Sequence, residues 1–297
     1  MARVLITGAT GFIGGALARR LREERAHEVI SPTRAALDLQ RGDIELPQGI
    51  DVLVHCAASR ERGDPSPSRM AEETSINVTA TARLYDRARA QGVPTIVHLS
   101  TISVLRPRQD PDALLDEDSP RVEAPTHPYA LTKRWAEELV FQLRGSFRAI
   151  AIVRPGMVYG RSMSKNGSLA RIAASLGEGE RYRMGRPDGD RHAPVYIDDV
   201  VDVLARLLAN PSNLLVNVSG PDAITERSMI DDMASCLDRR VSFEETDEPV
   251  ASVATSTARV DALFPDRIRT PWKVGAPRSF GDNQAGCSRE MSSPNDS

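Results

Sequence analysis

The chain has 297 residues, 40% of them hydrophobic, which is enough to bury a full core as one large α/β domain or as a domain with a smaller lobe. Its formal net charge of −3 argues against a nucleic-acid or anionic-membrane partner. The sequence has no long apolar run and no leader-like start, and its three cysteines lack the spacing of a metal site. We therefore expect a cytoplasmic protein with reduced thiols, no membrane segment and no bound metal.

The first motif is a predicted strand, a glycine turn and a helix. Arg3-Val4-Leu5-Ile6-Thr7 is a short apolar run, and Gly8-Ala9-Thr10-Gly11-Phe12-Ile13-Gly14 follows it directly. Gly8 allows a tight turn, Gly11 lets the backbone approach a pyrophosphate, and Gly14 lets the helix pack close to the strand. This context predicts a dinucleotide site, although the G-x-x-G-x-x-G spacing differs from that of the commonest dehydrogenases. The alternative is an ordinary glycine turn.

The second motif is a predicted helix start. Pro128 suits the first helical position, and Thr126 or His127 can cap the turn. Tyr129 and Lys133 are four residues apart, so they share one face of the helix. We expect the ammonium to lower the pKa of the Tyr129 phenol and to make it a proton donor or acceptor near neutral pH. The alternative is the edge of an ordinary amphipathic helix.

Together the two motifs resemble the extended short-chain dehydrogenase/reductase superfamily of nucleotide-sugar epimerases, dehydratases and ketoreductases. The resemblance runs from residue 3 to about residue 275. It implies an α/β fold, a doubly wound (Rossmann) parallel sheet with a smaller C-terminal substrate-binding lobe. We expect residues 1–160, joined by 193–218, to form the dinucleotide-binding domain, 161–192 and 219–276 to form the lobe, and 277–297 to be a flexible tail.

The nicotinamide cofactor is predicted from the loop after the second strand. Arg34 stands 20 residues after Gly14, where an acidic residue normally accepts the ribose hydroxyls of NAD. An arginine there can pair with a 2′-phosphate, which favours NADP(H), unless it is a solvated loop residue. Asp38 and Leu39 resemble the family's adenine-contacting pair, which leaves NAD(H) open.

Further cofactor contacts follow from the resemblance. Small residues at the end of the buried stretch 50–58 would border the dinucleotide, and Asn77 would organise the backbone beside it. Met157 stands where the family has asparagine. The complete predicted cofactor set is Gly8, Thr10, Gly11, Phe12, Ile13, Gly14, Arg34, Asp38, Leu39, Ala57, Ala58, Asn77, Ser100, Tyr129, Lys133, Pro155, Met157 and Val158.

The resemblance also implies a catalytic triad of Thr101, Tyr129 and Lys133. One register's error would move the hydroxyl role from Thr101 to Ser100 or Ser103. The 4,6-dehydratases carry Asp-Glu directly after this threonine, whereas here Ile102 and Ser103 follow it. Neither side chain supports that acid–base work, so 4,6-dehydration is disfavoured.

A nucleotide-activated sugar is the predicted substrate, with Thr101, Asn166, Arg191 and His192 as its contacts. The basic residues Arg181, Arg183, Arg186, Arg191 and His192 would recognise a diphosphate, or else form a solvated face. We expect an NAD(P)-dependent oxidoreductase that reduces a keto group of a nucleotide-activated deoxysugar. The alternatives are an epimerase with tightly bound NAD and a non-catalytic, cofactor-binding regulator. The sequence leaves a homodimer open.

Overall fold

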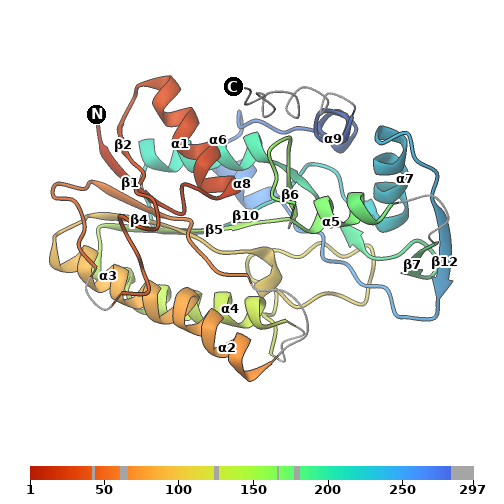
Figure 1. The fold of residues 1–297 in the computed structure, drawn as a ribbon, viewed down its shortest axis with the longest axis horizontal. Helices are drawn as coiled ribbons and strands as arrows, with labels where there is room; N and C mark the ends of the chain where they lie inside the picture. The colour runs from red at the N-terminus through yellow and green to blue at the C-terminus, as the bar shows by residue number, and fades with distance from the viewer. Residues whose placement is uncertain (42–43, 61–65, 124–126, 166, 177–180, 282–297) are drawn as a thin grey trace, which may run out of the picture.

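The structure is a computed structural model that describes residues 1–41, 44–60, 66–123, 127–165, 167–176 and 181–281. Six parallel strands form its central sheet in the order β10-β5-β4-β3-β1-β2 (Figure 1). The strands β3, β4 and β5 are buried along their whole length, as expected for a parallel sheet covered on both faces. The six strands are β1 (Arg3–Thr7), β2 (Glu28–Ile30), β3 (Val52–His55), β4 (Thr95–Leu99), β5 (Ala149–Pro155) and β10 (Leu214–Val218).

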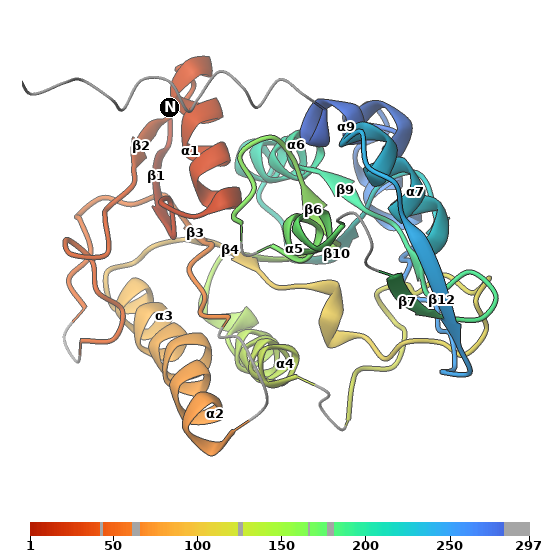
Figure 2. The same cartoon turned by 45° about the vertical axis from the view of Figure 1, so that its right-hand side comes forward.

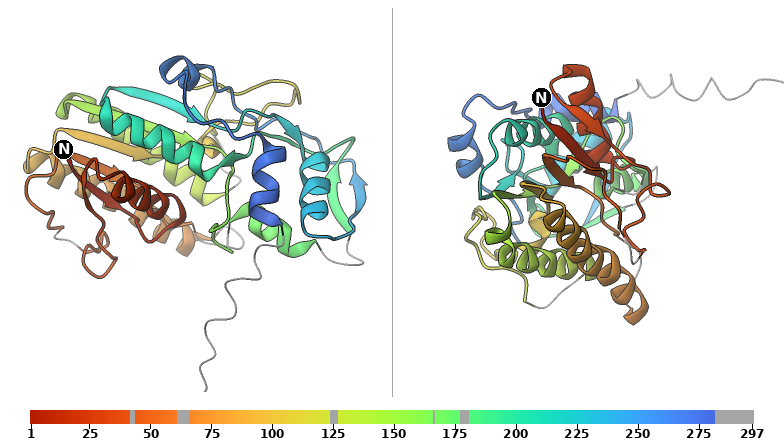
Figure 3. Two further views of the ribbon diagram at one scale, coloured as in Figure 1. Left: turned by 90° about the horizontal axis from the view of Figure 1, so that it is seen from above. Right: turned by 90° about the vertical axis from the view of Figure 1, so that its left-hand side faces the viewer.

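Helices cover both faces of this sheet (Figures 1 and 3). On one face α1 (Phe12–Glu24) packs against α6 (Ile197–Ala209). The other face carries α3 (Ala80–Ala90) and α4 (Pro128–Gln142). The predicted doubly wound α/β class is therefore confirmed. Within the described ranges, no helix is long and apolar enough to cross a bilayer.

The helix that leads into α3 starts earlier than predicted. It begins as α2 (Pro67–Thr74), where Ser66 accepts a hydrogen bond from Arg69 N at 3.3 Å and proline occupies the first turn. A π-helical turn, η1 (Ser75–Thr79), joins α2 to α3. The sequence from about Ala71 to Gln91 has the pattern of one long helix, so the pattern predicts its start about four residues too late.

A smaller lobe lies beside the carboxyl ends of the strands, at the right of Figure 2. It contains the short sheets β7 with β12 and β8 with β11, and a further two-stranded sheet pairs β6 with β9. Their bounds are β6 (Val158–Tyr159), β7 (Arg181–Gly185), β8 (Arg191–His192), β9 (Val195–Tyr196), β11 (Ile224–Thr225) and β12 (Ser242–Thr246). The remaining helices are α5 (Ser168–Ser175), α7 (Glu226–Cys236), α8 (Ala258–Leu263), α9 (Trp272–Phe280) and the 3₁₀ turns η2 (Ile102–Val104) and η3 (Arg144–Ser146).

The predicted tail starts too early at residue 277. Helix α9 continues through Phe280, which is 4% exposed and stacks on Tyr159 with ring centroids 6.4 Å apart. A buried aromatic ring at its end keeps this segment in the lobe, although its neighbours are polar. Residues 282–297 of the predicted tail lie outside the described residues.

Candidate active site

The site lies at the carboxyl ends of β1 and β3, where the order of the strands reverses. The chain passes from β1 to β2 on one side and returns to β3 on the other. Ligand crevices open at such switch points in doubly wound sheets. Two hollows lie at this switch point, a main cavity of about 610 Å³ and a side pocket of about 310 Å³. Both are lined by Gly8, Gly11, Cys56 and Ala58, so the glycine turn lies between them.

The glycine turn brings backbone against backbone. Gly8 has a φ of 70°, and a Cβ atom there would lie 2.6 Å from Ala57 N. A Cβ atom on Gly14 would lie 2.5 Å from the Gly8 carbonyl oxygen. Helix α1 follows Gly11, which supplies no side-chain cap, so the first helical amides are left for a ligand. These features fit the pyrophosphate of a dinucleotide.

Most of the predicted cofactor residues line these two hollows. Those on the main cavity are Gly8, Gly11, Phe12, Ile13, Gly14, Ala58, Ser100, Tyr129, Lys133, Pro155, Met157 and Val158. Those on the side pocket are Gly8, Thr10, Gly11, Arg34, Asp38, Leu39, Ala57 and Ala58. Asn77 lies behind the walls, where its buried amide bonds both backbone groups of Ser59 at 2.8 Å and Thr132 at 3.0 Å. It therefore ties the segment after β3 to α4.

The side pocket presents both residues that bear on cofactor choice. The Arg34 side chain is 73% exposed and lies 4.0 Å from the Asp38 carboxylate. Its guanidinium also donates to the Gln40 side chain. Asp38 accepts a hydrogen bond from Gln40 N at 3.1 Å. Arg34 and Asp38 thus lie together at the rim of the side pocket, and each is hydrogen-bonded to Gln40.

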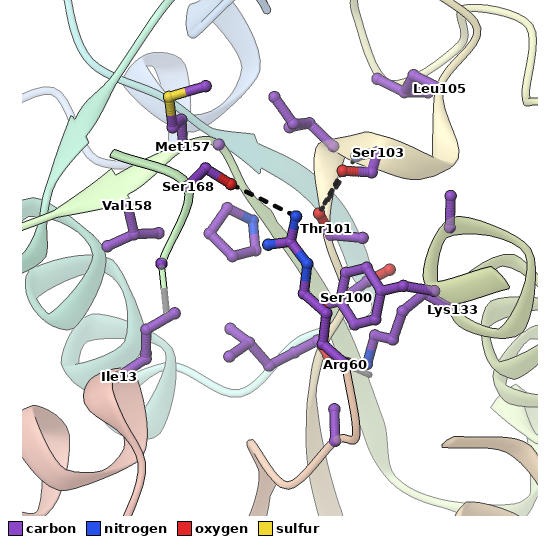
Figure 4. A pocket seen from close by; sticks show the side chains of 18 of the residues that line it. Ile13, Arg60, Ser100, Thr101, Ser103, Leu105, Lys133, Met157, Val158 and Ser168 are labelled. Atoms are coloured by element: carbon purple, nitrogen blue, oxygen red, sulfur yellow. Dashed lines mark hydrogen bonds between the residues drawn. The ribbon is translucent and has the colours of Figure 1, made fainter. Parts of the chain in front are cut away.

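The predicted triad lines one wall of the main cavity. Helix α4 starts with Pro128, and the His127 ring accepts a hydrogen bond from Tyr129 N at 3.1 Å, as the sequence predicted for one of its two capping candidates. The other candidate, Thr126, lies outside the described residues. Thr101 lies two residues after the end of β4, at the N-cap of η2, and donates a hydrogen bond to Ser103 Oγ at 3.2 Å (Figure 4). Tyr129, Lys133 and Thr101 all contact the same cavity.

The predicted pKa shift of Tyr129 is wrong in direction. Burial disfavours the phenolate and raises the pKa of the Tyr129 phenol, and the cation that opposes this effect is Arg60. The Lys133 ammonium instead donates to the Leu99 carbonyl oxygen at 2.6 Å. Tyr129 is therefore a neutral phenol at physiological pH, which is the proton-bearing form.

A buried ion pair supports Lys133 from one helical turn away. Glu137 and Arg154 are both fully buried and joined by two hydrogen bonds of 2.8 and 2.7 Å. Ser100 Oγ donates to the same carboxylate at 2.5 Å. Burial lowers the pKa of Lys133 to about 8, and the Glu137 charge acts in the opposite direction. Spacing alone could have found Glu137, which continues the face of Tyr129 and Lys133.

Arg60 is a site residue that the sequence analysis did not single out. It follows β3, and its guanidinium lies 5.3 Å from the centroid of the Tyr129 ring. It also donates to Ser168 Oγ, at the start of α5, at 3.4 Å. Figure 4 shows this side chain crossing the cavity. Arg60 thus links the Rossmann side of the site to the lobe.

The predicted substrate residues separate in the structure. His192 lines the main cavity, and burial lowers the pKa of its ring. Arg191 is not among the lining residues; its guanidinium pairs with Asp112 and donates to Ala223 O at 3.3 Å. Asn166 lies outside the described residues. Two other members of the basic cluster face acidic residues, Arg183 at 3.4 Å from Glu244 and Arg186 at 3.8 Å from Glu245.

Apolar side chains make the part of the wall that the sequence analysis missed. They belong to the connection between η2 and α4 and to the segment before α8, which are far apart in the sequence. Leu105 and Leu115 are 2% and 1% exposed and pack in one cluster with Val104. The apolar lining residues from these two segments are Leu105, Pro107, Leu115, Val122 and Val253.

Three relatives of known name are similar to this chain. UDP-glucose 4-epimerase of Vibrio cholerae is 27% identical over 80% of this chain and 76% of its own. A dTDP-4-dehydro-6-deoxy-D-allose reductase of Streptomyces bikiniensis is 29% identical over 75% and 77%. A 2-alkyl-3-oxoalkanoate reductase of Stenotrophomonas maltophilia is 30% identical over 70% of this chain and 64% of its own.

Solved structures share the fold. UDP-glucuronic acid 4-epimerase of Bacillus cereus, in complex with UDP-glucuronic acid and NAD, superposes with a TM-score of 0.78 at 19% identity, covering 94% of this chain and 98% of its own. The RMD protein of Pseudomonas aeruginosa, complexed with NADPH, gives 0.76 at 20% identity over 94% and 97%. A model of the NAD dependent epimerase/dehydratase family matches residues 4–219. The chain is thus an enzyme of this family, within the extended short-chain dehydrogenase/reductase superfamily.

Proposed function

We propose that this enzyme reduces a ketone with a nicotinamide cofactor, and that Tyr129 supplies the proton. The observation that carries this proposal is the half-buried Tyr129 phenol on the same cavity as Thr101, Lys133 and the glycine turn. A tyrosine that holds its proton at neutral pH is the form that reduction needs. Proton abstraction from an alcohol would require the phenolate, which burial disfavours.

The chain's own residues divide the work. The glycine turn and Lys133 would hold a nicotinamide cofactor, which would supply the hydride for the carbonyl carbon. Tyr129 gives its hydroxyl proton to the carbonyl oxygen, and Thr101 donates a hydrogen bond to the same oxygen. The Lys133 ammonium holds the cofactor ribose and stabilises the phenolate left after proton transfer. Arg60, 5.3 Å above the Tyr129 ring, stabilises that phenolate from the other direction.

NADPH is the proposed reductant, because Arg34 presents an exposed cation at the side pocket. The sequence predicts that the ketone belongs to a nucleotide-activated sugar. The Streptomyces bikiniensis relative, named as a reductase of such a sugar, supports this substrate. The Stenotrophomonas maltophilia relative, named for an alkyl oxoalkanoate, supports a different ketone.

Epimerisation is the second candidate function. The Vibrio cholerae relative is named as an epimerase, and solved epimerases of this fold carry NAD. Such an enzyme would keep its cofactor and return it unchanged after each turnover. We therefore expect purified protein to contain little nicotinamide and to consume one NADPH per product if it is a reductase. Tightly bound NAD⁺ with turnover in the absence of added cofactor would favour the epimerase.

The catalytic assignment is tested by Tyr129→Phe. This variant keeps the ring but has no proton to give, so kcat for ketone reduction should fall by about 10² to 10⁴-fold while NADPH affinity stays the same. Stopped-flow NADPH oxidation and equilibrium titration of NADPH measure the two quantities. Near-complete activity in Tyr129→Phe would move the acid role to another residue. The absence of NADPH binding in the parent enzyme would contradict the proposal itself.

A further inference from the structure

We propose that the acceptor end of the main cavity selects a ketone with an apolar body, such as a 3-oxo ester with an alkyl chain. This inference rests on the proposed ketoreduction and replaces the nucleotide-activated sugar as the substrate. It follows from three features of the described wall: the side chains it presents, the pairing of its backbone groups and the position of its cations.

The side chains beyond Thr101 are apolar. Leu105 and Leu115 are almost fully buried, Val253 lines the same cavity from the segment before α8, and Met157 lines it between β5 and β6. In Figure 4, Leu105 and Met157 lie in the upper part of the view, above Thr101, whereas the Arg60 label lies below Thr101. Such a lining gains free energy from burying hydrocarbon, and it leaves the hydroxyls of a sugar without partners.

The backbone of this wall is occupied by its own hydrogen bonds. Arg108 and Ser252 exchange a pair of backbone bonds at 3.0 and 2.7 Å. Leu115 N donates to Ala254 O at 2.9 Å, and Val253 N donates to Arg191 O at 2.9 Å. Peptide groups that pair with each other in this way are not offered to a polar ligand. The wall therefore acts on a substrate chiefly through its apolar side chains.

The two cations that the structure describes on the lining, Lys133 and Arg60, lie on the Tyr129 side of the cavity. Lys133 donates to Leu99 O at the cofactor end, and Arg60 lies over Tyr129 and donates to Ser168. The predicted diphosphate residue Arg191 pairs with Asp112 outside the lining. Burial keeps the pKa of His192 below its ordinary value, so its ring is neutral at physiological pH. Among the residues that the structure describes, none at this end supplies the positive charge that normally compensates the desolvation of a diphosphate.

One polar group lies beside the reacting carbonyl. Ser103 Oγ lies 3.2 Å from Thr101 Oγ1, and when Thr101 turns its hydrogen to the ketone the Ser103 hydroxyl can donate to a second oxygen of the ligand. A second oxygen close to the ketone, as in a 3-oxo ester, can accept that hydrogen bond. The reduction stays balanced: the ketone becomes an alcohol, NADPH becomes NADP⁺, and the proton comes from Tyr129.

A chain-length series tests the inference. The full-length enzyme is assayed with NADPH and ethyl 3-oxobutanoate, ethyl 3-oxohexanoate or ethyl 3-oxooctanoate, and in parallel with a dTDP-4-keto-6-deoxyhexose. We expect kcat/KM to rise about tenfold for every two added methylene groups, because each buried methylene contributes about 0.8 kcal/mol. Reduction of the nucleotide sugar without a chain-length effect would overturn the apolar substrate and leave ketoreduction standing. Failure to reduce either class would overturn both.

A pair of variants locates the effect at the wall. Val253 is a half-buried lining residue, so Val253→Asp places a charge where the alkyl chain would lie. The variant should lose at least tenfold in kcat/KM for ethyl 3-oxooctanoate, with a smaller loss for ethyl 3-oxobutanoate and unchanged NADPH affinity. Val253→Thr, which keeps the shape, should show the same trend more weakly.

The matched control is Val274→Asp, since Val274 is 42% exposed on α9 and lies outside the lining. This variant should keep the parent's chain-length series. If Val253→Asp and Val253→Thr also keep that series, the wall does not contact the substrate chain, and the inference is wrong.

Discussion

Two ionisable side chains set the working pH of the site. Burial raises the pKa of Tyr129, so the phenol keeps its proton well above neutrality. Burial lowers the pKa of Lys133 to about 8, so its positive charge is lost as the pH rises through that value. Both groups are in the form that reduction needs only below about pH 8. We therefore expect the rate of reduction to decline on the alkaline side because Lys133, and not Tyr129, loses its proton first.

Glu137 should control where that decline occurs. Its negative charge raises the pKa of Lys133, so Glu137→Gln should lower that pKa further and move the alkaline limb of kcat/KM to lower pH. The exposed neighbour Glu138, which pairs with Arg121, is the control, and Glu138→Gln should leave the limb in place. The measurement is the pH profile of kcat/KM for all three proteins.

Glu137→Gln also leaves the Arg154 charge buried without its partner, which costs about 3–5 kcal/mol of stability. The double variant Glu137→Gln with Arg154→Met removes both charges and keeps the test valid if the single variant unfolds. An alkaline limb that stays in place in both variants would mean that Glu137 has a purely structural role.

Arg34 should decide between the two nicotinamide cofactors. Arg34→Asp removes one attraction for the 2′-phosphate and adds one repulsion, so NADPH affinity should fall roughly tenfold or more. NADH has no phosphate there and should bind equally well or better. Arg41→Asp is the control, because Arg41 is similarly exposed and also near Asp38 but does not line the side pocket. Equal losses for NADH and NADPH in Arg34→Asp would show that Arg34 faces solvent, and Asp38 would then favour NAD.

At the scale of elements, strand β3 makes the fold sensitive to acid. Its last residue, His55, bonds Thr7 Oγ1 at 2.7 Å and Thr81 Oγ1 at 3.0 Å, and so joins β1 to α3. Burial lowers the pKa of His55 to about 3, against an ordinary value of 6.5. Between these values the unfolded chain binds a proton that the folded chain does not. Stability is therefore present above pH 6.5 and is lost as the pH falls toward 3.

The variant His55→Gln isolates this contribution. Glutamine keeps polar atoms near the two threonines but does not titrate, so the free energy of unfolding should fall less steeply with acid than in the parent. One proton accounts for at most about 1.4 kcal/mol per pH unit. Urea unfolding at several values between pH 7 and pH 4 measures the slope. Identical slopes in the two proteins would mean that His55 does not control the acid response.

At the scale of the whole molecule, Trp272 joins three parts of the chain. Its ring lies 4.9 Å from that of Tyr159, and its indole N–H donates to Asp232 on α7 at 2.9 Å. Its backbone N donates to Asp222 at 2.7 Å. The tryptophan is 1% exposed, so α9 fixes the lobe against the strand region that carries Tyr159.

Removal of this ring should be costly. Trp272→Ala should lower the free energy of unfolding by roughly 3–5 kcal/mol, as expected for loss of a large buried aromatic side chain. The second tryptophan of the chain, Trp135, is 40% exposed on α4 and offers the matched control. Trp135→Ala should change stability by less than about 1 kcal/mol. Similar urea midpoints for the two variants would contradict the role given to Trp272.

The sequence predicted the parts of the site that depend on local spacing. The glycine turn must follow a strand and open a helix, and Tyr129 and Lys133 must share a helical face, so both are visible without coordinates. Contacts between segments that are far apart in the chain could not be predicted from the sequence. Arg191 pairs with Asp112, 79 residues away, and Arg60 reaches Ser168 across 108 residues. The pKa of Tyr129 likewise depends on burial, which periodicity does not measure.

The ends of helices and strands show the same difference between local patterns, which the sequence reveals, and distant contacts, which it does not. Strand β3 and helix α4 were recognised from their apolar runs and proline start. The end of α9 was missed because its composition resembles a linker, and the burial of Phe280 depends on a ring more than a hundred residues earlier. Local composition therefore does not predict boundaries that depend on packing against distant residues.

The pairing of Arg108 with Ser252 has a consequence for how the enzyme is made. The two segments that pair here, one around Arg108 and one around Ser252, lie roughly 140 residues apart in the chain. At about 5–20 residues per second, a ribosome would need roughly 7–30 s to pass from the first segment to the second. The glycine turn, Tyr129 and Lys133 are all synthesised before that interval ends. We therefore expect Leu105 and Leu115 to be covered only after the segment around Ser252 has been synthesised, later than the glycine turn, Tyr129 and Lys133.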